Sequence, residues 1–224
     1  MAEESRRKAA EAAALRENLK RRKLQSRGRQ AAEDDAAIAS VLEFWFSGGD
    51  EAQGGFRPAW FEKDADFDGL CRERFADLSA QAAAGDLDRW AQTAEGGLAL
   101  LVLLDQIPRN IHRGTPKAFA ADPMALALAR RMVARGFDRE LGMPQRLFAY
   151  LPFTHAEDIA AQDECVRLVE SLPDAPWKAR AVQSAHAHRD VVAKFGRFPH
   201  RNMALGRPST ADELAYLAQP GAGF

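Results

Sequence analysis

Leu98-Ala-Leu-Leu-Val-Leu-Leu-Asp105-Gln-Ile-Pro108-Arg109-Asn110-Ile-His-Arg113-Gly114 is the stretch that decides the fold, because an apolar run passes directly into a charged corner. Residues 98–104 offer no polar face, so a helix formed by them must be covered on all sides by other helices. Pro108 disfavours helix at the residue before it and predicts a helix end or kink there. The stretch therefore predicts a central buried helix that ends in polar side chains.

Asp105 is the first polar residue after the apolar run. At the C-terminal end of a helix, the unpaired carbonyls disfavour a carboxylate. Burying that carboxylate without a partner would cost several kcal/mol. Arg109 and Arg113 follow closely in the sequence, so we expect Asp105 to hold these arginines in place.

Helical periodicity and end signals place further helices around this centre. Gly85, Gly136 and Gly196 are expected helix ends. Expected helix starts are Asp122-Pro123, with Asp122 as N-cap, and the capping boxes Thr154 to Glu157 and Thr210 to Glu213. The helices are expected near residues 36–46, 67–84, 122–136, 155–171, 177–195 and 210–217. The pattern predicts an all-α fold of helical hairpins in one domain, residues 36–224, after a tail of residues 1–35.

Composition excludes several classes of protein. The chain has 224 residues, 46% of them hydrophobic, which suits one well-buried domain. Its longest clean apolar run is far shorter than the roughly 20 residues that cross a bilayer, so no transmembrane segment is expected. The charged start Met-Ala-Glu-Glu lacks the apolar region of a signal peptide. With only two cysteines, Cys71 and Cys165, no disulfide framework is expected, and we predict a cytoplasmic protein.

The tail carries most of the charge asymmetry. Its first thirty residues hold ten Lys and Arg against four Glu, a net charge of +6, whereas the rest of the chain carries −7. Only a thin apolar stripe, Leu15, Leu19 and Leu24, is available for burial. One interpretation is an arm that contacts nucleic acid or an anionic surface. The other, which the composition favours, is a solvated helical or frayed appendage.

Polar residues recur on faces that should point inward. In the helix expected after Thr154, the apolar side is set by Ile159, Val166 and Val169, and His155, Asp158 and Gln162 fall on the same side. His188 likewise lies on the apolar face of the helix 177–195. Such groups need hydrogen-bond partners, so they indicate either a satisfied internal network or a binding site.

A second corner, Phe195-Gly-Arg197-Phe-Pro199-His200-Arg201-Asn202, repeats the proline and the Arg-Asn pair of the first. A guanidinium binds carboxylate or phosphate with two parallel bonds, and an amide adds a donor. Both corners therefore suit an anionic group. The alternative is that they are structural staples between helical hairpins.

Common catalytic and nucleotide motifs are absent, including the P-loop, Gly-x-Gly-x-x-Gly, Gly-x-Ser-x-Gly and His-Glu-x-x-His. His155, Asp158 and His188 are the strongest metal candidates, but they lack paired-ligand spacing and the nearby arginines oppose a cation. We expect neither a metal nor a cofactor.

Six motifs carry a family resemblance: Val41-Leu-Glu-Phe-Trp45-Phe46, Trp60-Phe61-Glu-Lys63, Leu103-Leu-Asp-Gln-Ile-Pro-Arg-Asn110, Phe119-Ala-Ala-Asp122, Tyr150-Leu-Pro-Phe-Thr-His155-Ala-Glu-Asp158 and Phe195-Gly-Arg-Phe-Pro-His-Arg-Asn202. With them the chain, from about Ala37 onward, resembles an uncharacterised bacterial family, domain of unknown function 924. The resemblance implies an all-helical, tetratricopeptide-like fold and no established activity. Ala156 departs from the family pattern, which usually has serine there.

Three hypotheses follow. The first is a pocket that holds an anionic group of a peptide or small metabolite. It would be formed by Asp105, Arg109, Asn110, Arg113, His155, Asp158, His188, Arg197, His200, Arg201 and Asn202. The second is a hydrolase of a phosphorylated or carboxylated small molecule, in which His155 is the acid/base and Asp158 orients it. In the third, both corners only join helices.

Overall fold

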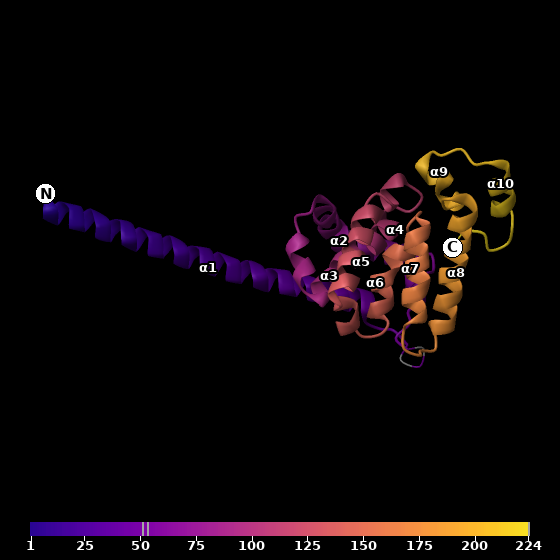
Figure 1. The fold of residues 1–224 in the computed structure, drawn as a ribbon, viewed down its shortest axis with the longest axis horizontal. Coiled ribbons are helices and arrows are strands. Elements are labelled where there is room, and N and C mark those ends of the chain that lie inside the picture. The colour runs from indigo at the N-terminus through magenta and orange to yellow at the C-terminus, as the bar shows by residue number, and fades with distance from the viewer. Residues whose placement is uncertain (51, 53, 224) are drawn as a thin grey trace. The chain divides into compact units, whose positions relative to one another are not determined.

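The computed structural model describes the chain except residues 51, 53 and 224, and except the side chains of residues 2, 3 and 5–16 in the first helix. As predicted, the fold is all-α (Figure 1), and the described residues form no strand beyond one isolated bridge between Asp50 and Phe56. The α-helices are α1 Ala2–Phe46, α2 Ala65–Ala84, α3 Ala94–Leu101, α4 Ile107–Ile111, α5 Asp122–Arg135, α6 Gln145–Thr154, α7 Ile159–Glu170, α8 Lys178–Phe195, α9 Asn202–Leu205 and α10 Ala211–Leu217. Between them lie 3₁₀ turns Pro58–Trp60, Asp88–Gln92, Pro116–Ala118, Phe137–Glu140 and Pro199–Arg201, and the π-helical turn Val102–Gln106.

The chain divides into two units, Met1–Ser40 and Val41–Phe224. In the first unit α1 runs without a break through Asp34 and Asp35, where we expected the tail to end. Leu19 and Leu24 are exposed there, so the apolar stripe buries neither of them. Binding of nucleic acid or an anionic surface by this segment stays a prediction.

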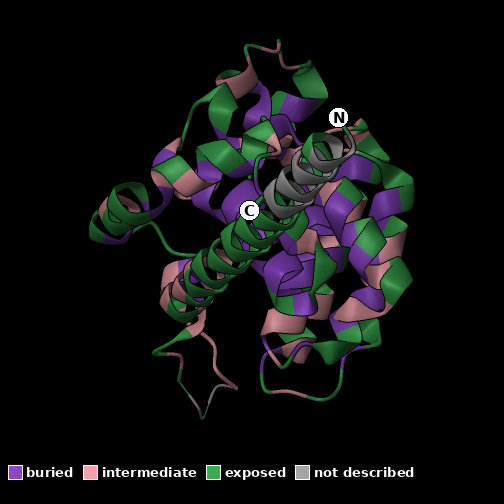
Figure 2. Ribbon diagram, turned by 90° about the vertical axis from the view of Figure 1, so that its left-hand side faces the viewer, coloured by how far each residue is buried: buried purple, intermediate pink, exposed green. Residues whose placement is uncertain are grey.

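The apolar run forms the centre of the second unit, as predicted. Residues 96–108 are all buried, and they include Leu98 and Leu103 with no exposed surface. Around them the other helices turn their buried sides inward and their exposed sides outward (Figure 2). The polar residues that follow the apolar run, Asp105 and Gln106, are therefore buried in the core as well.

Pro108 does not end the central helix, which continues to Ile111. The π-helical turn before it widens the backbone, with the Ile107 N–H bonded to the Val102 carbonyl. A proline ring normally clashes with the carbonyl four residues earlier, and the wider turn relieves that clash. Because Pro108 has no N–H to donate, the Leu103 carbonyl accepts instead from the Ser79 hydroxyl at 2.8 Å.

The glycine helix ends and one of the two capping boxes were predicted correctly. Gly85, Gly136 and Gly196 end α2, α5 and α8 in the left-handed conformation. Thr210 and Glu213 form the predicted capping box of α10. Asp122 is the first residue of α5 rather than its N-cap, because its carboxylate binds arginines elsewhere.

The helix start at Thr154 was wrong. Thr154 is the last residue of α6, and α7 begins at Ile159 with the Asp158 side chain accepting from the Ala160 N–H at 3.0 Å. The inward face is correspondingly shifted: Ile159 is 41% exposed, and the buried positions of α7 are Ala161, Gln162, Cys165, Leu168 and Val169. Periodicity predicted a face for one helix, but the chain breaks into two.

Candidate functional site

A cavity of about 540 Å³ lies in the second unit where α4, the end of α6, α8 and the turn Pro199–Arg201 meet. That volume lies within the usual range for small-molecule sites. Of the residues predicted for the site, the cavity wall contains Arg109, Asn110, Arg113, His155, His188, His200 and Arg201. The two corners and the His155 segment therefore meet around one cavity.

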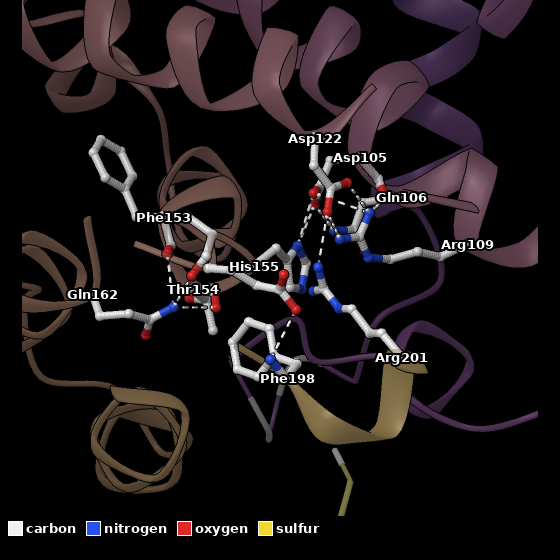
Figure 3. A network of polar contacts seen from close by, with 12 residues as sticks. Asp105, Gln106, Arg109, Asp122, Phe153, Thr154, His155, Gln162, Phe198 and Arg201 are labelled. Carbon is white, nitrogen blue, oxygen red and sulfur yellow. Dashed lines mark hydrogen bonds and ion pairs between the residues drawn. The ribbon is translucent and has the colours of Figure 1, made fainter. Parts of the chain in front are cut away.

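Asp105 lies directly behind this wall, fully buried (Figure 3). Its two carboxylate oxygens are 2.7 and 2.9 Å from Nδ1 of His155, and one is 3.2 Å from Nη1 of Arg109. Gln106 donates its side-chain amide to the same carboxylate. Burial alone would raise the pKa of Asp105, but Arg109 and His155 hold it below its ordinary value, so the group is a carboxylate at neutral pH.

His155 caps the C-terminal end of α6, which turns its ring toward Asp105 and the cavity. Burial lowers its pKa, and the positive charge of Arg109 lowers it further, so the ring is neutral near pH 7. Gln162 fixes the end of the helix beneath the ring: its side-chain amide donates to the carbonyls of Phe153, Thr154 and Ala156 at 3.2, 2.7 and 2.7 Å. The amide nitrogen of Gln162 is thus part of an internal network, although its side-chain oxygen is buried without a partner.

Asp158, which we expected to orient His155, does not do so. Its carboxylate caps α7 and lies 3.2 Å from Nη2 of Arg130, with about half of its side chain exposed. The break between α6 and α7 separates His155 and Asp158, which a continuous helix would have placed on one face.

Asp122 is the residue that sequence reasoning missed. It accepts two hydrogen bonds from Arg109, at 2.9 and 3.0 Å, and one from Nη1 of Arg201 at 3.2 Å. The ring of Phe119 lies beside both guanidinium groups, 5.6 Å from that of Arg109 and 4.7 Å from that of Arg201. Two signals were available: Asp122-Pro123, which we had read as a helix start, and the motif Phe119-Ala-Ala-Asp122, which carried only the family resemblance.

Arg201 is buried yet has few hydrogen bonds. Only 6% of the residue is exposed. Among the described residues, only Asp122 accepts from its guanidinium, and its Nε is buried with no partner. Burial, and next the charge of Arg109, lower the pKa of Arg201 to about 10, so it remains protonated at neutral pH. Aromatic rings of Phe119 and Phe198 flank it at 4.7 and 4.6 Å.

His188 and His200 complete the polar wall as neutral rings. Nδ1 of His188 is 2.8 Å from the Ser184 carbonyl oxygen, to which it donates. Burial lowers the pKa of His188 to about 3 and that of His200 to about 4. The positive charge of the cavity wall is therefore carried by its arginines.

Arg197 and Asn202, predicted for the site, lie outside the cavity wall. Arg197 makes two bonds to the Glu213 carboxylate, at 2.6 and 2.8 Å, and Asn202 donates to Ser209 and to Glu213. These contacts join the corner to α10. The staple interpretation therefore holds for this half of the second corner, whereas Arg201 faces the cavity.

Arg113 reaches the cavity at an exposed position, where its guanidinium is bonded to Asp68 at 2.8 to 3.1 Å. Asn110 points its amide nitrogen at the sulfur of Cys71, 3.5 Å away. Arg113 is thus neutralised by Asp68. We had expected Asp105 to be its partner, because the two residues are close in the sequence.

An aromatic wall also lines the cavity, and sequence reasoning missed it as well. It consists of Phe56, Trp60, Phe61 and Trp177, with Leu147 and Leu151 beside them. Phe56 and Phe61 stack with their centroids 5.5 Å apart, and Trp177 donates its indole N–H to the Gly54 carbonyl at 3.2 Å. Trp60 and Phe61 were quoted above as a motif, but nothing local in the sequence indicated that they would line the same cavity as the arginines.

The described residues contain no group of three or more His, Cys, Asp or Glu able to hold a metal ion. Both cysteines are free and buried. No helix in the described part of the chain combines the length and the apolar character that a membrane span requires. The arrangement offers instead arginine donors, neutral imidazoles and aromatic surface within one cavity.

Comparison with known proteins agrees with the motifs. A family model described as a bacterial protein of unknown function, DUF924, matches residues 41–221. A solved structure, that of a protein of unknown function from Agrobacterium tumefaciens, is similar with 42% sequence identity and a TM-score of 0.74, covering 82% of this chain and 98% of that one. No curated protein matches the chain. The match begins at the first residue of the second structural unit and covers most of that unit, so the chain belongs to the bacterial family of unknown function DUF924.

Proposed function

We propose that the second unit binds a small molecule through an anionic group placed against Arg201. The observation that carries this proposal is the buried guanidinium of Arg201, which lines the cavity with one hydrogen bond and an unpartnered Nε. Nε has no exposed surface, so a ligand in the cavity would meet the outer nitrogens of the guanidinium, of which only Nη1 donates to a described residue, Asp122. A carboxylate or phosphate oxygen would accept from the N–H groups of this buried cation that have no protein partner, and for this reason the site favours an anion.

The unequal pairing of the two buried arginines supports the same proposal. Asp105 and Asp122 carry two negative charges and Arg109 and Arg201 two positive ones, so the inner network is neutral before any ligand arrives. Arg109 already binds both carboxylates, whereas Arg201 shares only Asp122. The exposed Arg180 also borders the cavity, with its guanidinium 5.9 Å from the centroid of Phe56. Glu62, also exposed, adds one carboxylate to the wall, so the preference for an anion comes from the incomplete pairing of Arg201 and not from an excess of positive charge.

A melting-temperature screen with carboxylates and phosphates tests the proposal. A ligand present at one hundred times its Kd stabilises the folded state by about 2.7 kcal/mol. We expect at least one anion to raise the melting temperature in a dose-dependent manner, and we expect Arg201→Gln to remove that rise.

Arg197→Gln is the matched control, because it also separates an arginine from a buried carboxylate, Glu213, but outside the cavity. It should lower the melting temperature and leave the ligand-induced rise intact. If no anion in the screen gives a rise, or if Arg201→Gln keeps all of it, the binding proposal is wrong.

A second candidate, hydrolysis of a phosphorylated or carboxylated small molecule, is favoured by the contact between Asp105 and His155. A buried carboxylate that holds Nδ1 of a neutral histidine leaves Nε2 as a base toward the cavity. His155 would then accept a proton from a water that attacks the substrate, and would return the proton to the leaving group. Arg201 would stabilise the developing negative charge.

Turnover of phosphate monoesters and carboxylate esters measures this activity. We expect Asp105→Asn and His155→Ala to reduce kcat by about 10²-fold or more, the typical worth of general-base catalysis. Full turnover in the His155→Ala variant would remove hydrolysis from consideration and leave the binding proposal untouched.

A further inference from the structure

His155 presents a hydrogen-bond acceptor to the cavity. An ionised carboxylate is an acceptor only, so with both oxygens of Asp105 within 2.9 Å, Nδ1 must carry the hydrogen. In a neutral imidazole the other nitrogen, Nε2, then has a lone pair. No described residue forms a hydrogen bond with Nε2 of His155, which lines the cavity.

The ring cannot easily exchange these roles. Turning it over would put the C–H of Cδ2 where Nδ1 donates, and moving its hydrogen to Nε2 would place a lone pair against the carboxylate of Asp105. That carboxylate is itself held by Arg109 and by Gln106. Gln162 fixes the helix end that carries the ring through three carbonyls. The acceptor is therefore a permanent feature of the cavity near neutral pH.

The acceptor and the anion-binding arginine belong to one polar network on the cavity wall (Figure 3). His155 and Arg109 both contact Asp105, and Arg109 and Arg201 both contact Asp122. A bare carboxylate ligand bound to Arg201 would bring its oxygen lone pairs toward Nε2 and be repelled. A ligand that places a donor there would satisfy both groups.

We infer that the cavity selects a hydroxy acid, whose anionic group binds Arg201 and whose neighbouring hydroxyl donates to Nε2 of His155. A hydroxyl suits the position better than an ammonium group, because the arginines of the wall would repel a second cation. The apolar side chains that also line the cavity, among them Trp60, Trp177 and Leu147, favour an aromatic or other apolar body on this acid. This inference rests on the proposed function, since it specifies the ligand of the same site.

Two acids that differ in one hydroxyl test it: 3-phenyllactate and 3-phenylpropionate. We expect isothermal titration calorimetry at pH 7.5 to show that phenyllactate binds about tenfold more tightly, the worth of one hydrogen bond. In His155→Asn the two acids should bind equally. Asparagine can keep the donor to Asp105 at the place of Nδ1 but has no atom at the place of Nε2, so the fold is preserved, which circular dichroism checks.

His186→Asn is the control, because His186 is on α8 but exposed and paired with Glu170. It should keep the preference for phenyllactate. Equal binding of both acids to the unaltered protein, a preference that survives in His155→Asn, or no binding of either acid would each overturn the inference. The anion screen described above decides the proposed function separately: a positive screen with any of these three failures supports anion binding without the hydroxyl requirement.

Discussion

Asp122→Asn should be among the most destabilising single substitutions of a polar residue in the second unit. The carboxylate of Asp122 neutralises two arginines, whose side chains are only 18% and 7% exposed, through bonds of 2.9, 3.0 and 3.2 Å. The amide would keep the shape but leave the inner network with a net charge of +1. Removing one partner of a buried ion pair costs about 3–5 kcal/mol.

The lower end of that range applies here, because the Asp122 side chain is 15% exposed and Arg109 keeps its contact with Asp105. We therefore expect the free energy of unfolding to fall by about 3 kcal/mol. For a domain of this size, that corresponds to a decrease in melting temperature of about 6–12 °C. Equilibrium unfolding in urea, with calorimetry for the melting temperature, measures both.

Asp163→Asn serves as the matched control. Asp163 also pairs with an arginine, Arg189 at 2.6 Å, but its side chain is 55% exposed, so its loss should cost less than about 1 kcal/mol. A cost for Asp122→Asn that is no larger than that of the control would refute the reasoning, because it would mean that the two arginines of the cavity do not depend on this carboxylate.

Two further predictions concern pH and packing. Since burial lowers the pKa of His188 to about 3 and that of His200 to about 4, each binds fewer protons in the folded than in the unfolded state below about pH 6.5. The free energy of unfolding should thus fall as the pH drops from 6.5 to 4. His188→Gln or His200→Gln should each reduce the slope of this free energy against pH by about 1.4 kcal/mol per pH unit. An unchanged slope would contradict the conclusion that both rings are neutral in the folded protein. Gly96→Ala should lower the free energy of unfolding in urea by several kcal/mol, because the added Cβ would lie 2.2 Å from the Trp90 carbonyl oxygen. Gly69→Ala in α2, where a Cβ would meet nothing within 4 Å, should instead stabilise by about 0.5–1 kcal/mol. Equal effects of the two substitutions would refute the prediction.

Features set by neighbouring residues could be predicted from the sequence. The apolar run 98–104 had to be buried, whatever surrounded it, and it is. Glycines 85, 136 and 196 end their helices because the left-handed conformation is accessible to glycine at little cost. Arg109 contacts Asp105 because residues four apart lie on one face of a helix. Each of these depends on contacts within one or two turns.

Contacts between distant segments were decided by the tertiary structure alone. His155 lies 50 residues from Asp105, and Arg201 lies 79 residues from Asp122. Their pairing depends on how α4, α5, α6 and the turn Pro199–Arg201 pack, which no local pattern encodes. The same holds for the aromatic wall. The break between α6 and α7 reassigned Asp158 from the site to a helix cap, and it gave His155 its partner. The sequence by itself thus determined that an apolar run ending in polar residues is buried. Packing decided which other polar side chains enter the core and which of them meet, because a buried charge pairs with whichever opposite charge the assembled helices bring within reach.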